Sequence, residues 1–220
     1  MPRLADHDQR RAQITDAARR VIAGDGLGAA TFQSVAAEAG ISVRLVQYYF
    51  GTKRQFLQAT HQAVVAGAGS RFTRSLSALG NDPAPREVIR AILAELLPAD
   101  AARRQDAIVL NAFHTAALTT PDDGQEGVGT ADIGAKDVSA ENIGAEDTLG
   151  APRFLVTTIA EQLRRTRAGA APAARRAADL DAELIVASAA GLTQLLLVDI
   201  RAAGRADQLL DRLLDRMVEG

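Results

Sequence analysis

The apolar positions along this chain recur every three or four residues, which is the period of an α-helix that buries one face. No window shows the alternation of apolar and polar residues that a half-buried β-strand needs. The pattern therefore predicts an all-α protein. The predicted helices span residues 10–23, 31–39, 42–49, 53–79, 86–97, 101–120, 153–167, 180–203 and 205–218.

Two of the predicted helices are short and are joined by a tight turn, which is the arrangement of a helix-turn-helix motif. Thr31 and Ser42 are suitable N-caps for these helices, and Gly40 stands where the chain must turn sharply. Val46 and Phe50 form an apolar stripe on the second helix. The other face of this helix is then turned outward, and we expect it to enter the major groove of DNA.

The outward face of the second helix carries side chains that suit DNA bases. Arg44, Gln47 and Tyr48 share this face at spacings of i, i+3 and i+4. Arginine matches the two acceptors of guanine, and glutamine matches the donor and acceptor of adenine. Val43 is suited to a thymine methyl group. Contacts to phosphates, which set the register rather than the sequence, are predicted for Thr31, Gln33, Ser42, Tyr49 and Lys53. The alternative is a helical hairpin of an ordinary core, with both tyrosines merely packing.

The same stretch resembles the amino-terminal signature of TetR-type transcriptional repressors. The resemblance lies in Ala39–Ser42 (AGIS), the aromatic run Tyr48–Phe50 and the following Gly51–Lys53, and it covers roughly the first 60 residues. It implies a three-helix DNA-binding domain at residues 1–55 and a larger helical domain at 56–220 that binds an effector and dimerises. Arg44 and Gln47 stand where this family often has Gly and Tyr, so the resemblance leaves the operator sequence open.

The charge of the chain is distributed unevenly. The net charge is −2, but residues 1–60 carry eight basic and five acidic residues, a local charge of +3, and the remainder carries −5. A basic end concentrates the attraction for phosphates on the predicted helix-turn-helix.

One segment, residues 121–150, differs from its surroundings in composition. It holds eight acidic residues, six glycines, no aromatic residue and a single lysine, Lys136. So few apolar groups cannot compensate for the entropy lost on ordering. We therefore expect a mobile acidic insertion on the surface.

The last two predicted helices, at about 180–218, indicate a homodimer. The first of them is apolar on nearly every face between Leu184 and Ile200, so that it needs cover both from its own subunit and from a partner. The pair also resembles the two-helix contribution of this family to a four-helix dimer interface. A purely intramolecular core is the alternative.

Polar residues interrupt several apolar helices, and the resemblance implies an effector pocket among these helices. The alternative is that each residue bonds to a neighbouring backbone group or faces solvent. The predicted pocket residues are Asn111, Phe113, His114, Phe154, Thr158, Ser188 and Gln194.

Other kinds of site lack support in the sequence. The chain has no cysteine, and its three histidines are scattered without acidic residues at a recurring ligand spacing, so we predict no metal site and no cofactor. No catalytic motif appears, and an enzyme is not expected. The amino terminus lacks the apolar core of a signal peptide, and polar residues interrupt the longest apolar run, so we expect a cytoplasmic protein without a membrane span.

Together these observations predict a TetR-type repressor that binds a palindromic operator as a homodimer and is released by a small-molecule effector. Two alternatives remain open. One is an all-helical small-molecule binding protein or enzyme without a role on DNA, and the other is an activator of the same type.

Overall fold

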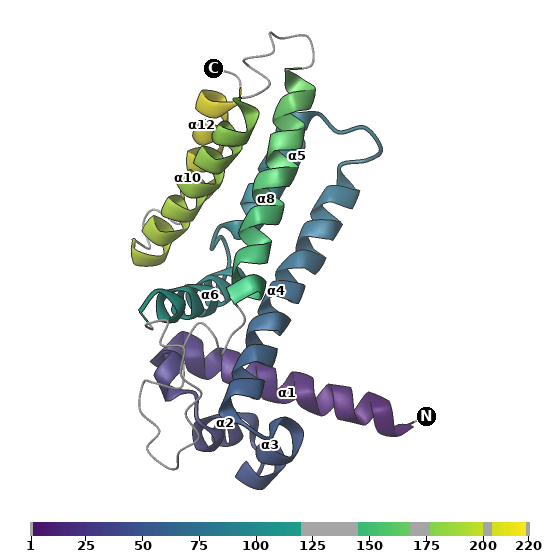
Figure 1. The fold of residues 1–220 in the computed structure, drawn as a ribbon, viewed down its shortest axis with the longest axis vertical. Coiled ribbons are helices and arrows are strands. Elements are labelled where there is room, and N and C mark those ends of the chain that lie inside the picture. The colour runs from purple at the N-terminus through teal and green to yellow at the C-terminus, as the bar shows by residue number, and fades with distance from the viewer. Residues whose placement is uncertain (1, 120–144, 168–176, 200–203, 219–220) are drawn as a thin grey trace. The chain divides into compact units, whose positions relative to one another are not determined.

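The computed structural model describes residues 2–119, 145–167, 177–199 and 204–218, and all regular structure in these ranges is helical (Figure 1). This confirms the predicted all-α class. The helices are α1 (Pro2–Asp25), α2 (Phe32–Ala39), α3 (Val43–Phe50), α4 (Lys53–Ala78), α5 (Pro85–Leu96), α6 (Ala101–Thr119), α8 (Ala145–Thr166), α10 (Ala178–Val198) and α12 (Ala206–Met217), with a short 3₁₀ helix, η1 (Leu27–Ala29), after α1.

The chain divides into two compact units. We call residues 1–66 and 108–148 the head, and residues 67–107 and 149–220 the body. All three boundaries fall inside helices, the first in α4, the second in α6 and the third in α8. The boundary predicted at residue 55 also lies within α4, and the head continues along this helix to Ala66.

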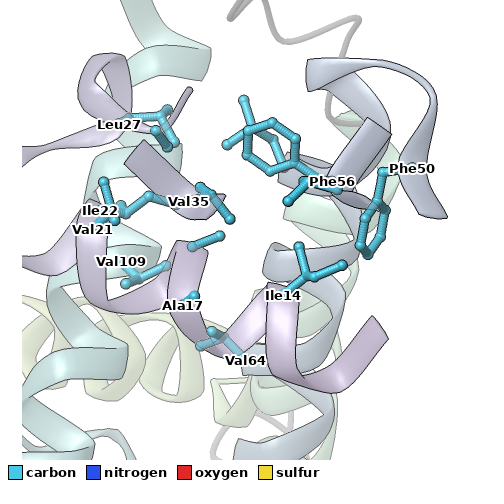
Figure 2. Packing of buried hydrophobic residues seen from close by; sticks show 14 of the residues in the cluster. Ile14, Ala17, Val21, Ile22, Leu27, Val35, Phe50, Phe56, Val64 and Val109 are labelled. Carbon is cyan, nitrogen blue, oxygen red and sulfur yellow. The ribbon is translucent and has the colours of Figure 1, made fainter. Parts of the chain in front are cut away.

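The head is built around side chains that converge from α1, α2, α3, α4 and α6 (Figure 2). Ile14, Val35, Val46 and Phe56 are completely buried there, and Phe50 is 2% exposed. Burying a side chain of this size stabilises the fold by about 1.5–3 kcal/mol. Because α2 and α3 each bury one stripe in this core, their opposite faces are fixed toward the outside.

The body packs α5, α8, α10 and α12 around a second apolar cluster. Ile89, Ile159, Ile185 and Leu210, one from each of these helices, are completely buried. Ion pairs join α5 to α12 at the edge of the cluster, where Arg90 lies 2.7 Å from Asp211 and 3.2 Å from Asp207.

The limits of three helices differ from the predictions by more than two residues. Helix α1 begins at Pro2 rather than residue 10, and proline is well tolerated in the first turn of a helix. Helix α10 ends at Val198 rather than residue 203, and residues 200–203 lie outside the described ranges.

Helix α8 begins at Ala145, before the predicted start at residue 153, and continues through Pro152. The end of the predicted acidic insertion is therefore helical. Acidic side chains in a first helical turn are stabilised by the helix dipole, so an acidic composition does not exclude a helix there. Residues 121–144 of the insertion lie outside the described residues.

Helix α10 has two apolar faces. Ala182, Ile185, Ala189 and Leu196 are completely buried in the body, whereas Leu180, Leu184, Leu195 and Val198 are 50–85% exposed. By length and composition this helix could also cross a membrane, with a mean hydropathy of 1.5 over its most apolar window, of which 22% is buried. Its buried face lies against α5 and α12, which is the packing of a core helix with one face uncovered.

Candidate nucleic-acid interface

The first helix of the predicted motif, α2, is closed at both ends by local hydrogen bonds. The Thr31 hydroxyl accepts from the backbone N–H of Ser34 at 3.1 Å, and the Ser34 hydroxyl accepts from the N–H of Thr31 at 2.9 Å. This reciprocal capping fixes where α2 begins. At the other end Gly40 has a φ of 67°, and the N–H of Ile41 donates to the carbonyl of Ala36 at 3.0 Å. A left-handed residue at this position favours glycine and turns the chain sharply toward α3.

The second helix, α3, presents the predicted base-reading face to the outside. The Ser42 hydroxyl accepts from the N–H of Leu45 at 3.2 Å and caps the helix, which confirms its predicted N-cap role. Arg44 and Gln47 are exposed, and the Tyr48 side chain is 76% exposed. Because the stripe on the other side of α3 is held in the head core, these three side chains project together from one rigid surface.

The residues predicted to bind phosphates differ in their exposure. Gln33 and Ser42 are exposed, whereas Thr31, Tyr49 and Lys53 are half-buried, as is Val43, the predicted contact to a thymine methyl group. The Ser42 hydroxyl uses its oxygen as an acceptor in the cap, and its hydrogen can still be donated to a phosphate oxygen.

Lys53 is the first residue of α4, and the start of this helix is also capped. The Thr52 hydroxyl accepts from the N–H of Gln55 at 3.2 Å, and the Gln55 side chain accepts from the N–H of Thr52 at 3.3 Å. A lysine at a helix N terminus combines its own charge with the positive end of the helix dipole.

Ion pairs within the head leave the recognition face positive. Arg20 of α1 binds both Asp16 of its own helix and Glu38 of α2, and the hydrogen bond with Glu38 raises the pKa of the Arg20 guanidinium. Two of the five acidic residues of the first 60 are thereby paired, while Arg44 and Arg54 remain exposed.

Helix α1 contributes contacts that the pattern of the sequence did not reveal. The Arg11 guanidinium donates to the carbonyl of Tyr49 at 2.7 Å and lies over the Phe50 ring, 4.2 Å from its centroid. The Gln13 amide donates to the carbonyl of Ala39 at 2.9 Å. The only signal in the sequence was the basic, polar start of α1, which does not specify a partner.

The predicted effector residues do not all fall in one unit. Phe113 is completely buried in the head core, its ring 5.1 Å from that of His61, and His114 is exposed on the same helix as Asn111. In the body, Phe154, Ser188 and Gln194 are exposed and Thr158 is half-buried, and the Thr158 hydroxyl donates to the backbone carbonyl of Phe154 at 2.9 Å. The predicted pocket remains a hypothesis.

Within the described ranges, no group of three or more His, Asp or Glu side chains is placed to hold a metal ion. The most buried charges of the body instead pair with each other. Asp106 of α6 lies 3.0 Å from Arg71 of α4, and Arg71 lies 3.4 Å from Glu95 of α5. These ion pairs link α5 to the parts of α4 and α6 that belong to the body.

Residues 14–60 match the family described as bacterial regulatory proteins, tetR family. The HTH-type transcriptional regulators BetI of Burkholderia mallei (strain NCTC 10229) and of Burkholderia cenocepacia (strain HI2424) are each 40% identical over 94 residues, which is 43% of this chain and 47% of theirs. The chain thus matches about half the length of these relatives.

Solved structures of similar fold cover nearly the whole chain. A transcriptional regulator from Rhodococcus sp. Rha1 has a TM-score of 0.72 at 22% identity, with 96% of both chains covered. A regulator from Saccharomonospora viridis in complex with choline has a TM-score of 0.65 at 19% identity, covering 94% of this chain and 96% of its own. The multidrug binding protein EbrR, complexed with malachite green, has a TM-score of 0.55 at 20% identity, covering 93% and 97%. At this identity the likeness concerns the fold alone.

Proposed function

Because residues 14–60 match the tetR family of bacterial regulatory proteins, we propose that the protein is a cytoplasmic transcriptional repressor. It binds a roughly palindromic operator as a homodimer and releases it when a small molecule binds the body. The observation that carries this proposal is the face of α3, on which Arg44, Gln47 and Tyr48 project outward from a helix anchored by Val46 and Phe50.

We infer separate roles for the residues on α3 and at the start of α4. Arg44 and Gln47 read base edges, since a bidentate contact of this kind discriminates against a wrong base by about 1–3 kcal/mol. Lys53, at the start of α4, holds a phosphate and sets the register. Two recognition helices related by a two-fold axis then require half-sites one helical turn apart or a multiple of this.

The exposed face of α10 is the surface through which we propose that two copies associate. Leu180, Leu184, Leu195 and Val198 lie on one side of the helix, at successive spacings of four, eleven and three residues, each close to a whole number of helical turns. Gly191 lies in the same stripe, and a side chain added there would meet no atom of its own subunit within 4 Å. Glycine inside a helix costs about 1 kcal/mol relative to alanine, and close approach of a partner helix explains its presence.

Release by an effector requires a connection between body and head, and α4 and α6 both belong to the two units. On the body side the ion pair between Arg71 and Asp106 joins these two helices. A ligand that moves one of them therefore moves the other. The ligand must bind the conformation that cannot bind DNA more tightly, because equal affinity for both conformations shifts nothing.

Selection from a pool of random DNA duplexes on the purified protein, followed by titration of the enriched duplex, tests the DNA-binding role. Arg44→Ala should lower the affinity for this duplex about 5- to 150-fold and relax the preference at one base pair, whereas Lys53→Ala should weaken all duplexes alike and reduce the salt slope by about one. Failure of the wild-type protein to enrich any duplex would exclude the proposal and favour the small-molecule binding protein.

Adding choline, the ligand named in one structural neighbour, and a panel of other small molecules to the protein–duplex complex tests release. A molecule that both raises the melting temperature of the free protein and dissociates the duplex is an effector. A reporter gene behind the enriched duplex then distinguishes repression from activation by the sign of its response.

A further inference from the structure

Helix α1 holds the carboxyl ends of both helices of the DNA-binding motif. Its Arg11 donates to the carbonyl of Tyr49 at 2.7 Å, in the last turn of α3, and its Gln13 donates to the carbonyl of Ala39 at 2.9 Å, the last residue of α2. Both residues precede Ile14, where the match to the family begins. We propose that Arg11 and Gln13 are positioning residues for sequence recognition, which they support by fixing the direction of the recognition helix; this inference rests on the proposed DNA-binding function.

The carbonyls that these side chains reach need a partner. The last four carbonyls of a helix have no N–H of the same helix to accept from. In α2, the turn at Gly40 satisfies the carbonyls of Ala36 and Ala37 through the N–H groups of Ile41 and Gly40, at 3.0 and 3.2 Å. The turn provides no donor for the carbonyl of Ala39, the last residue of α2. The side-chain amide of Gln13 supplies this donor.

The carbonyls at the end of α3 also find donors partly in the following turn and partly in α1. The carbonyls of Gln47 and Phe50 accept from the N–H groups of Gly51 and Thr52, at 2.7 and 2.5 Å. The carbonyl of Tyr49, which lies between them, accepts from Arg11. A cation at this place also complements the negative end of the helix dipole.

Further contacts make this attachment stiff. The Arg11 guanidinium stacks on the Phe50 ring, the His7 ring lies 4.8 Å from that of Tyr49, and Arg10 donates to the Gln13 side-chain oxygen at 2.8 Å. Residues of α1 thus touch the recognition helix on its side chains and its backbone at once.

The consequence concerns specificity rather than general affinity. Tyr48, which reads DNA in the proposed function, directly precedes the residue whose carbonyl Arg11 holds, and its ring contacts that of Tyr49 with centroids 5.3 Å apart. Base contacts tolerate little displacement because hydrogen bonds weaken steeply when they are misaligned. Phosphate contacts through flexible side chains tolerate more. Loosening the end of α3 should therefore reduce binding to the cognate duplex while leaving binding to other sequences nearly unchanged.

A different role for Arg11 would be a direct phosphate contact, and the two roles predict different results. Removal of a phosphate contact weakens cognate and non-cognate DNA alike and lowers the salt slope by about 0.9. Removal of a positioning contact lowers the ratio of the two affinities at an unchanged salt slope. Gln13 is uncharged, so that its substitution cannot change the salt slope by removing a charge.

The experiment compares the full-length protein and its variants on two duplexes: the one enriched by the wild-type protein from a random pool, and a scrambled duplex of the same composition. We expect Arg11→Ala to lower the ratio of cognate to scrambled affinity about tenfold and Gln13→Ala about threefold, in line with charged and neutral hydrogen bonds. Arg11→Gln, which replaces the donor without its charge, should restore a large part of the ratio. Arg19→Ala is the matched control, since Arg19 carries the same charge on the same helix and pairs with Asp16 at 3.2 Å.

Hydrogen exchange over residues 43–53 provides a second measurement. The released end of α3 should exchange faster, while α1 stays protected. An unchanged affinity ratio in both Arg11→Ala and Gln13→Ala would overturn the inference, as would an equal loss on both duplexes with a reduced salt slope for Arg11→Ala and Arg11→Gln. A variant with lost protection throughout the head would show a folding role only and would count against the inference. If the wild-type protein enriches no duplex, the proposed function itself fails, which is distinct from all these outcomes.

Discussion

A substitution on the exposed face of α10 gives a decisive test of the proposed assembly. Leu184→Glu places a carboxylate in the apolar stripe, at a side chain that is 55% exposed in the protomer. Burying a whole leucine contributes about 2 kcal/mol, so burial of this exposed half contributes about 1 kcal/mol. A two-fold interface contains the position twice. Truncation to alanine should therefore raise the dimer dissociation constant about 30-fold.

The charged variant should have a larger effect. A carboxylate buried without a partner costs several kcal/mol, and each 1.4 kcal/mol is a factor of ten. We therefore expect Leu184→Glu to raise the dissociation constant at least a thousandfold. Gly191→Leu should also separate the subunits, because it adds bulk where the protomer itself has open space.

Sedimentation velocity over a range of protein concentrations measures this equilibrium directly. Ser77→Glu, which adds the same charge at an exposed position of α4, is the control and should sediment as the wild type. Leu196→Glu is unsuitable as a test, since Leu196 is completely buried in its own subunit and its replacement should unfold the body. If Leu184→Glu and Gly191→Leu both sediment as wild-type dimers, or if the wild type is a monomer at every concentration, the reasoning from the exposed stripe is refuted.

Three further predictions concern other parts of the chain. Deleting residues 122–143, which leaves α8 intact from Ala145, should leave the melting temperature within a few degrees of wild type because so acidic and glycine-rich a segment buries little; a drop of ten degrees or more would contradict this. Gly40→Ala should destabilise the head by about 1 kcal/mol in urea titration, since φ is 67° at this position, and a neutral effect would mean that the turn relaxes. The pKa of Asp100 is lowered chiefly because its carboxylate accepts a hydrogen bond from the backbone N–H of Arg103 at the start of α6. The stability that Asp100 contributes is therefore complete above its ordinary pKa of 3.8 and is lost as the pH falls through its lowered pKa in the folded protein. Asp100→Ala should thus cost about 1 kcal/mol at neutral pH and progressively less in acid, and a pH-independent cost would refute the carboxylate's role.

Local sequence was sufficient to predict the helix-turn-helix. Thr31, Ser42 and Gly40 act on backbone groups within a few residues of themselves, so their roles follow from the order of residues alone. The buried stripe of Val46 and Phe50 and the exposed one of Arg44, Gln47 and Tyr48 follow from the helical period. These features depend on short-range geometry, which a sequence displays directly.

Contacts between distant residues could not be obtained in this way. Arg11 meets the carbonyl of Tyr49 38 residues away, and Gln13 meets that of Ala39 26 residues away. Every helix offers such carbonyls at its end, and a side chain's choice among them depends on how the helices pack. The support of the recognition helix by α1 was therefore decided by the tertiary structure.

The division of α10 into a buried and an exposed face was likewise decided by the tertiary structure. Where a helix is apolar on nearly all sides, its periodicity does not show which side its own subunit covers. The sequence predicted that α10 needs cover on two sides. Only the packing of α5 and α12 in the cluster that holds Ile185 and Leu196 decided that Leu184 and Leu195 stay exposed, because burial is a property of the folded chain and hydrophobicity is a property of the residue.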